Sequence, residues 1–236
     1  MLKQITLFLT LFFTVLATPV LAEQAPNLEE LLAVLEKGYA SVDDLQADFS
    51  QRTYIGSLKR EEKGGGELFL KKKGAGNAMF RFNYSKPKQQ IISNGKTVWY
   101  YLPENGQVIQ SEATKLFSGG NAMAMSYLTG LGNLSADFNV KLLADGPNKK
   151  GNYLLELVPK KPNQTVVKLQ LTVPANAVEK YRAGKGEAVF PVTASVLHDQ
   201  MGNRTTIEYS RIRINRGLGS ERFSFKIPAG VEVIKQ

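Results

Sequence analysis

The chain lacks cysteine altogether, and it has a single histidine in 236 residues. Without cysteine it can form no disulfide, use no catalytic thiol and carry no lipid on an N-terminal cysteine. The one histidine, His198, lies beside an expected hairpin turn, where neither a Ser-His-Asp triad nor a histidine metal site is expected. The sequence therefore predicts a protein that is not an enzyme and that needs no metal and no cofactor.

Long apolar runs are also scarce, because the only notable one is at the N-terminus. Lys3 precedes an apolar stretch from Ile5 to Leu16, and Val20 and Ala22 fit the cleavage rule of secretory signals. We predict a cleavable signal peptide over residues 1–22 and one exported domain over residues 23–236. An uncleaved N-terminal anchor is the alternative, but the apolar stretch is short for a membrane span.

Acidic residues are fewer than basic ones, 21 against 30, which gives a formal net charge of +9. The lysine pairs and triplets flank expected glycine-rich turns, and no basic stretch alternates with exposed aromatic residues as a nucleic-acid platform does. We therefore expect solvated turn charges and no nucleic-acid partner, with weak attraction to anionic lipid headgroups as the alternative.

What the chain has in abundance is alternating apolar residues, which predict about ten antiparallel strands. Phe80, Phe82 and Tyr84 share one face of an expected strand. Asn94-Gly95 predicts a type I′ hairpin with positive φ at both residues. Farther along, the apolar phase of the strand from 204 to 214 changes, which predicts a bulge near Ser210-Arg211.

Helices are expected in two places. Apolar residues from Leu28 to Tyr39 recur at helical spacing, and Asn27 is a suitable N-cap. Between residues 111 and 133, apolar and methionine residues broken by glycines predict short helices inserted between strands. Either set of helices has an apolar stripe that can cover one face of the sheet.

Three separated blocks carry a family resemblance: residues 45–51 (LQADFSQ), residues 79–101 (MFRFNYSKPKQQIISNGKTVWYY) and residues 223–233 (FSFKIPAGVEV). They resemble the LolA family of periplasmic lipoprotein carriers, and the last block resembles the family's terminal strand. The resemblance implies a mainly β fold, an unclosed antiparallel β-barrel (half-barrel) with short helices as a lid over a hydrophobic cavity. The missing cysteine separates the chain from LolB, the lipid-anchored receptor of the same fold. The polar stretch from 174 to 191 is longer than the family's hairpin at this place, and we assign it no purpose from the sequence.

The resemblance also implies a function. A carrier of this family accepts triacylated lipoproteins from an inner-membrane ABC transporter, shields their acyl chains and hands them to an outer-membrane, LolB-like receptor. It works in the periplasm, and we expect a monomer. The alternatives are a carrier of another lipid or glycolipid, which the insertion favours, and a lipoprotein-sensing interaction domain.

The candidate site follows from the same reading. Its floor is expected to consist of Phe49, Leu68, Leu70, Phe80, Phe82, Ile91 and Val98, and its lid to carry Leu116, Phe117, Met123, Met125 and Leu128. Methionine suits a lid because its flexible thioether adapts to irregular partners. The apolar pattern by itself favours a filled core over a cavity, whereas the resemblance favours the cavity.

One departure from the family concerns the lid. The family commonly has an arginine before the aromatic strand that ties the closed lid down, and this chain has lysines in that region. Lys72 or Lys73 is the candidate lid latch. Lysine lacks the planar fork of arginine, so we predict a more loosely held lid.

Overall fold

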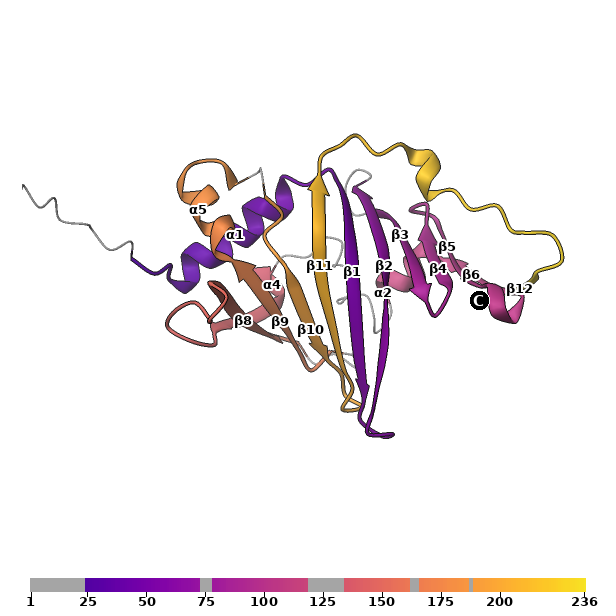
Figure 1. Cartoon of the computed structure of the whole chain (residues 1–236), viewed down its shortest axis with the longest axis horizontal. Coiled ribbons are helices and arrows are strands. Elements are labelled where there is room, and N and C mark those ends of the chain that lie inside the picture. Colours follow the sequence, from indigo (N-terminus) through magenta and orange to yellow (C-terminus); the bar gives the residue numbers. More distant parts are fainter. Residues whose placement is uncertain (1–23, 73–77, 119–133, 162–165, 187–188) are drawn as a thin grey trace, which may run out of the picture.

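The computed structural model describes residues 24–72, 78–118, 134–161, 166–186 and 189–236. Within them, twelve strands form one sheet in the order β12-β6-β5-β4-β3-β2-β1-β11-β10-β9-β8-β7 (Figure 1). All neighbours are antiparallel except β12 and β6. The two edge strands, β7 and β12, do not pair with each other in the described part of the chain, so the expected unclosed, mainly antiparallel sheet is confirmed.

The strands are β1 (Asp44–Ile55), β2 (Arg60–Lys72), β3 (Ala78–Lys86), β4 (Gln89–Ser93), β5 (Thr97–Leu102), β6 (Gln107–Glu112), β7 (Phe138–Leu142), β8 (Asn152–Pro159), β9 (Lys168–Pro174), β10 (Ala194–His198), β11 (Arg204–Ile214) and β12 (Glu232–Lys235). The helices are α1 (Leu28–Ala40), α2 (Ala113–Ser118), α4 (Leu134–Asp137) and α5 (Ala175–Arg182), with short 3₁₀ turns at Pro103–Asn105 and Ser220–Phe223.

Helix α1 begins where the sequence predicts. The Asn27 side chain accepts a hydrogen bond from the Glu30 amide at 2.8 Å, which satisfies one of the free amides of the first turn. Leu31, Val34 and Leu35 are buried in the main core, so the apolar stripe of α1 faces the sheet. Figure 1 shows α1 lying with α5 over the part of the sheet formed by β8, β9 and β10.

The strand β11 contains the bulge that its sequence predicts. Gln46 pairs with Arg213 while Asp48 pairs with Ser210, and Arg211 has a φ of 49°. The extra residue reverses which side chains face inward, so that Ile212 packs against the same core as Ile207. Apolar residues on both sides of the bulge therefore pack against the same core.

Two expectations about turns and ends are wrong. The turn between β4 and β5 is not type I′, because only Gly95 (φ 86°) has positive φ and Asn94 does not. Instead the Asn94 side-chain oxygen accepts hydrogen bonds from the backbone amides of Lys96 (2.9 Å) and Thr97 (2.8 Å), which closes a three-residue loop. The block 223–233 is not one terminal strand: only β12 pairs, and it does so in parallel with β6.

The segment before β12 packs on the outer face of the sheet, where Leu218 and Phe223 form a second apolar cluster with Phe69 and Met79. Its start is held by Asp44, whose carboxylate accepts the amides of Arg216, Gly217 and Leu218 at 2.7–3.0 Å. Farther on, the ring of Phe225 packs beside Tyr101, with centroids 5.5 Å apart. The segment therefore covers apolar residues of the outer face that would otherwise meet water.

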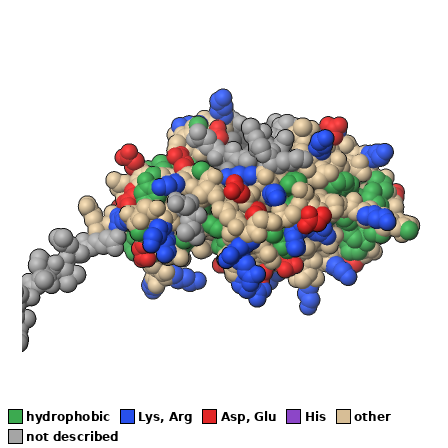
Figure 2. All heavy atoms as spheres, turned by 90° about the horizontal axis from the view of Figure 1, so that it is seen from above, with side chains coloured by type: hydrophobic (Ala, Val, Ile, Leu, Met, Phe, Trp, Pro, Cys, Tyr) green, Lys and Arg blue, Asp and Glu red, His purple; other side chains and the backbone are tan. Residues whose placement is uncertain are grey.

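The polar stretch from 174 to 191 contains α5, which packs on α1. Ala177 and Val178 of α5 are buried in the main core. The Arg182 guanidinium donates to both carboxylate oxygens of Glu30, at 2.6 and 2.8 Å, a two-pronged ion pair between the helices. Figure 2 shows lysine and arginine side chains spread over one face of the molecule with acidic ones among them, and not gathered in a single stripe.

Candidate functional site

The seven residues predicted as a cavity floor lie together on the inner face of the sheet. Six are buried in the main apolar cluster, and Ile91 packs against it. The aromatic rings there fill space by meeting edge to face: Phe49 and Phe82 have centroids 5.5 Å apart, and Phe80 and Phe82 6.1 Å. These residues share one surface, and their rings are packed against one another. Their role as the floor of an acyl-chain cavity stays a prediction.

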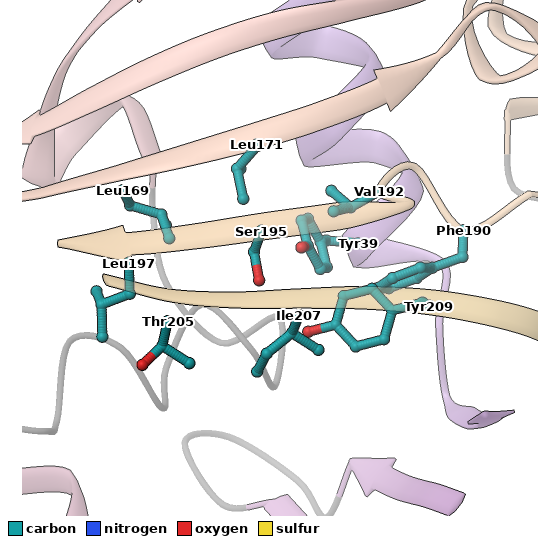
Figure 3. A pocket seen from close by; sticks show the side chains of 10 residues that line it. All are labelled: Tyr39, Leu169, Leu171, Phe190, Val192, Ser195, Leu197, Thr205, Ile207 and Tyr209. Carbon is teal, nitrogen blue, oxygen red and sulfur yellow. The ribbon is translucent and has the colours of Figure 1, made fainter. Parts of the chain in front are cut away.

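A cavity of about 120 Å³ lies on the same inner face, beside the other strands. It is enclosed by α1, the segment after α5, and β9, β10 and β11 (Figure 3). Its lining consists of Tyr39, Leu169, Leu171, Phe190, Val192, Ser195, Leu197, Thr205, Ile207 and Tyr209. None of the seven predicted floor residues is among them.

Strand alternation builds the floor of this pocket. Every second residue of β9, β10 and β11 points inward, and the register aligns them in two rows across the strands. One row runs Leu171–Ser195–Ile207 and the other Leu169–Leu197–Thr205. The floor is therefore a small grid of aliphatic side chains with two hydroxyl groups.

The wall opposite the floor comes from two distant segments. Tyr39 lies in the last turn of α1, and Phe190 follows α5. The Phe190 ring meets Tyr39 edge to face at 5.3 Å between centroids and Tyr209 at 6.3 Å. The segment whose purpose the sequence left open thus supplies one wall of the pocket.

The described residues that line the pocket include no charged side chain. Burial raises the pKa of Tyr39 above its usual range, and burial raises that of Tyr209 to about 12 although a hydrogen bond with Ser195 acts in the opposite direction. Both phenols therefore stay neutral at any physiological pH. A neutral, mostly aliphatic pocket is suited to a hydrocarbon chain.

Comparison with known proteins agrees with this architecture. The family model described as outer membrane lipoprotein carrier protein LolA matches residues 40–226. The chain belongs to the LolA family. An outer-membrane lipoprotein carrier protein of Albidiferax ferrireducens is 31% identical over 66% of this chain and 68% of its own length. One from Pseudomonas aeruginosa is 28% identical over 91% of this chain and 90% of its own.

A solved structure shows the same fold at a larger distance. An uncharacterised conserved protein from Thermus thermophilus aligns with a TM-score of 0.51 and 14% identity, covering 88% of this chain and 98% of that one. In the described part of this LolA-family chain, no helix is both long and apolar enough to cross a membrane.

The predicted lid is described only in part. Leu116 and Phe117 belong to α2, which follows β6, whereas Met123, Met125 and Leu128 lie outside the described residues. Their role as a lid stays a prediction.

Of the two candidate latch residues, Lys73 lies outside the described residues and Lys72 is at the end of β2. The Lys72 ammonium donates to the carbonyl oxygens of Tyr39 (2.5 Å) and Ala40 (3.3 Å). Burial lowers the pKa of Lys72. Lys72 thus holds the C-terminal end of α1, where a cation also suits the helix dipole, and it does so next to the pocket residue Tyr39. Its role in latching a lid stays a prediction.

Sequence reasoning missed the pocket lining. In the sequence, Leu169 and Leu171 alternate with polar residues, which places them on one face of a strand. No sequence signal places Tyr39 and Phe190 opposite that face. Their positions depend on how α1 and α5 pack on the sheet, which the apolar periodicity does not determine.

Proposed function

We propose that this protein is a periplasmic carrier that shields the acyl chains of lipoproteins on their way from the inner to the outer membrane. The observation that carries the proposal is the uncharged, mainly aliphatic pocket beneath α1 on the inner face of an unclosed sheet. The names of the relatives, outer-membrane lipoprotein carrier proteins, support it. No catalytic step is proposed.

The physical need for such a carrier is large. Each acyl methylene exposed to water costs about 0.8 kcal/mol, so ten of them cost roughly 8 kcal/mol. An apolar pocket recovers that free energy while the cargo crosses an aqueous compartment. Its affinity must stay moderate, because a receptor has to withdraw the cargo.

The pocket as it stands is too small for whole acyl chains. An engineered cavity of about 150 Å³ takes one benzene molecule, so the present 120 Å³ admits only a short piece of chain. Loading therefore requires the packed inner face to open further. Cargo then selects the opened state by its own burial, and docking on a partner can reverse the change.

The partners follow from this role. The cargo is a triacylated lipoprotein, delivered by an inner-membrane ABC transporter that spends the ATP and passed on to a LolB-like receptor in the outer membrane. Residues 1–22 serve as the cleaved signal that exports the chain. The carrier acts as a monomer.

A release assay tests the proposal. Purified mature protein is added to spheroplasts that synthesise a radiolabelled outer-membrane lipoprotein, and soluble one-to-one complexes are counted. Leu197→Glu places a charge in the half-buried rim of the pocket and should abolish release, while Val158→Glu, at an exposed position of β8, should not. Circular dichroism confirms that both variants fold.

The absence of release by the wild-type protein would contradict the proposal. If the same preparation yielded bound free lipid on extraction, the carrier of another lipid or glycolipid would take its place.

A further inference from the structure

Four hydroxyl groups interrupt the apolar lining of the pocket, and three of them belong to Tyr39, Ser195 and Tyr209. Figure 3 shows the oxygens of Tyr39, Ser195 and Tyr209 directed toward its central part from α1, β10 and β11. Burial raises the pKa of both phenols; hydrogen bonding to Ser195 acts to lower that of Tyr209, and the charge of Tyr209 raises that of Tyr39 further, so each group lies within reach of the next. The three hydroxyls therefore form one cluster.

The cluster has unused hydrogen-bonding capacity. Tyr39, Ser195 and Tyr209 carry three hydroxyl protons, and a contact between Ser195 and Tyr209 can use only one of them. The fourth hydroxyl of the lining differs, because Thr205 is bonded to Thr53 at 3.3 Å. Covering a hydroxyl with bare hydrocarbon would leave its donor unpaired at a cost of about 1–3 kcal/mol, so a pocket meant for bare hydrocarbon would be better without these groups.

The electrostatics restrict what the cluster can bind. The phenols stay protonated because burial raises their pKa, so they act as donors. Among the described residues no cation lines the pocket, and the nearby Lys72 ammonium is engaged by carbonyl oxygens of α1. A carboxylate would have to shed its hydration without a counter-ion, which is strongly unfavourable. A neutral acceptor, such as an ester or amide carbonyl, avoids that cost.

The grid of the floor positions the rest of such a ligand. Ser195 belongs to the row with Leu171 and Ile207, and the neighbouring row, Leu169–Leu197–Thr205, continues the apolar surface along the strands. A carbonyl at Ser195 would thus lead its alkyl chain over Leu169 and Leu197.

We propose that Tyr39, Ser195 and Tyr209 bind the carbonyl oxygen of an ester- or amide-linked acyl chain, and that the pocket selects acyl esters and amides over free fatty acids and bare alkanes. The inference rests on the proposed carrier function and states which chemical form of the chain this pocket accepts.

The test uses three probes of similar length: methyl decanoate, decanoate and undecane. Binding to the mature protein at pH 7.4 is measured by displacement of a hydrophobic fluorescent dye, and for undecane also by headspace gas chromatography. The wild-type protein should bind methyl decanoate most tightly and decanoate least. Tyr39→Phe, Tyr209→Phe and Ser195→Ala each remove one hydroxyl with little change of shape, and each should weaken methyl decanoate binding about fivefold while changing undecane binding less than twofold.

The matched control is Tyr54→Phe, a partly exposed tyrosine of β1 outside the pocket, which should leave all three affinities unchanged. Equal losses for methyl decanoate and undecane, or no loss for either, would overturn the proposal, as would decanoate binding as tightly as its ester. The double variant Tyr39→Phe/Tyr209→Phe, checked for folding, guards against one hydroxyl replacing the other.

The two proposals fail separately. If the wild-type protein releases lipoprotein from spheroplasts while the hydroxyl variants keep full affinity for the ester, the carrier function stands and the carbonyl site falls. If ester selectivity is found without release, the site stands as a lipid site and the carrier function falls.

Discussion

The two halves of the inner face solve the same packing problem differently. In β1–β4 several inward residues are aromatic, and rings such as Phe49, Phe80 and Phe82 meet edge to face. In β9–β11 the inward residues are mostly aliphatic, with Ser195, Thr205 and Tyr209 among them, and a cavity remains. The strands β1–β4, which are rich in aromatic residues, therefore form a filled half of the inner face. The strands β9–β11 form a hollow half, where the cavity lies between smaller residues and a wall contributed by α1 and the segment after α5.

Two phenylalanines offer a matched comparison between the halves. Phe82 and Phe190 are each 8% exposed, and each has two ring neighbours within 6.5 Å between centroids. Only Phe190 borders the cavity. Any difference between their alanine variants therefore reports on the cavity and not on exposure or residue type.

The largest effect is expected for Phe82→Ala. Its ring is surrounded by other side chains, so its removal forfeits those contacts and leaves a new void, at a cost of about 3–5 kcal/mol. The free energy of unfolding from urea denaturation measures the loss. A cost below about 2 kcal/mol would show that this half of the face is not filled.

Phe190→Ala should cost less, about 2 kcal/mol, because one side of its ring already faces empty space and has fewer contacts to lose. The same change enlarges the pocket. We expect didecanoylglycerol to bind more tightly relative to methyl decanoate than in the wild-type protein, measured by dye displacement. Equal destabilisation by Phe82→Ala and Phe190→Ala, with unchanged ligand preference, would remove the distinction between the halves.

The sequence predicted the filled half better than the hollow half for a physical reason. Alternation along β3 places Phe80, Phe82 and Tyr84 on one face, and large rings on one face meet their neighbours almost regardless of detail. A cavity instead forms where the side chains of two facing elements are too short or too far apart to make contact. The alternation of Leu169 and Leu171 with polar residues can be read from the sequence, but the distance from them to the opposite wall depends on where Phe190 lies after α5.

The same limit appears in the turns. The bulge in β11 was predictable because the phase of Ile207 and Ile212 changes within one strand. The turn at Asn94-Gly95 was not, because the Asn94 carboxamide bonds two backbone amides and thereby selects a longer loop than the dipeptide suggests. A turn type predicted from a dipeptide is therefore unreliable where a side chain forms hydrogen bonds with the backbone of the turn.

The outer face of the hollow half supplies a pH-dependent contribution. Glu156 of β8 is 7% exposed and accepts bonds from Lys168 (2.8 Å), Lys141 (2.9 Å) and Gln170 (3.2 Å). These partners, Lys168 first, lower the pKa of Glu156 to about 2. A lowered carboxyl pKa stabilises the fold above the unfolded value of 4.5, and the benefit disappears as the pH falls from there toward 2.

Glu156→Gln should therefore destabilise the protein by about 1–2 kcal/mol at pH 7 and by almost nothing near pH 2. The measurement is the difference in unfolding free energy between variant and wild type at several pH values. Phe82→Ala is the control, since the loss of apolar contacts should give a difference that is nearly independent of pH. A Glu156→Gln effect that stays constant down to pH 2.5 would contradict the assignment.

The smallest effect is expected at the far end of α1, which roofs the hollow half. Asn27→Ala removes the cap on the Glu30 amide and should cost about 1 kcal/mol, whereas Asn27→Asp keeps an acceptor there and should cost little. Tyr39 lies 12 residues farther along the helix, a rise of about 18 Å, so fraying of the first turn should not reach the pocket. Urea denaturation should show the loss of stability while methyl decanoate binding stays unchanged. If Asn27→Ala also weakened the ester, α1 would move as one rigid body, and the wall of the hollow half would be set by the whole helix and not by its last turn.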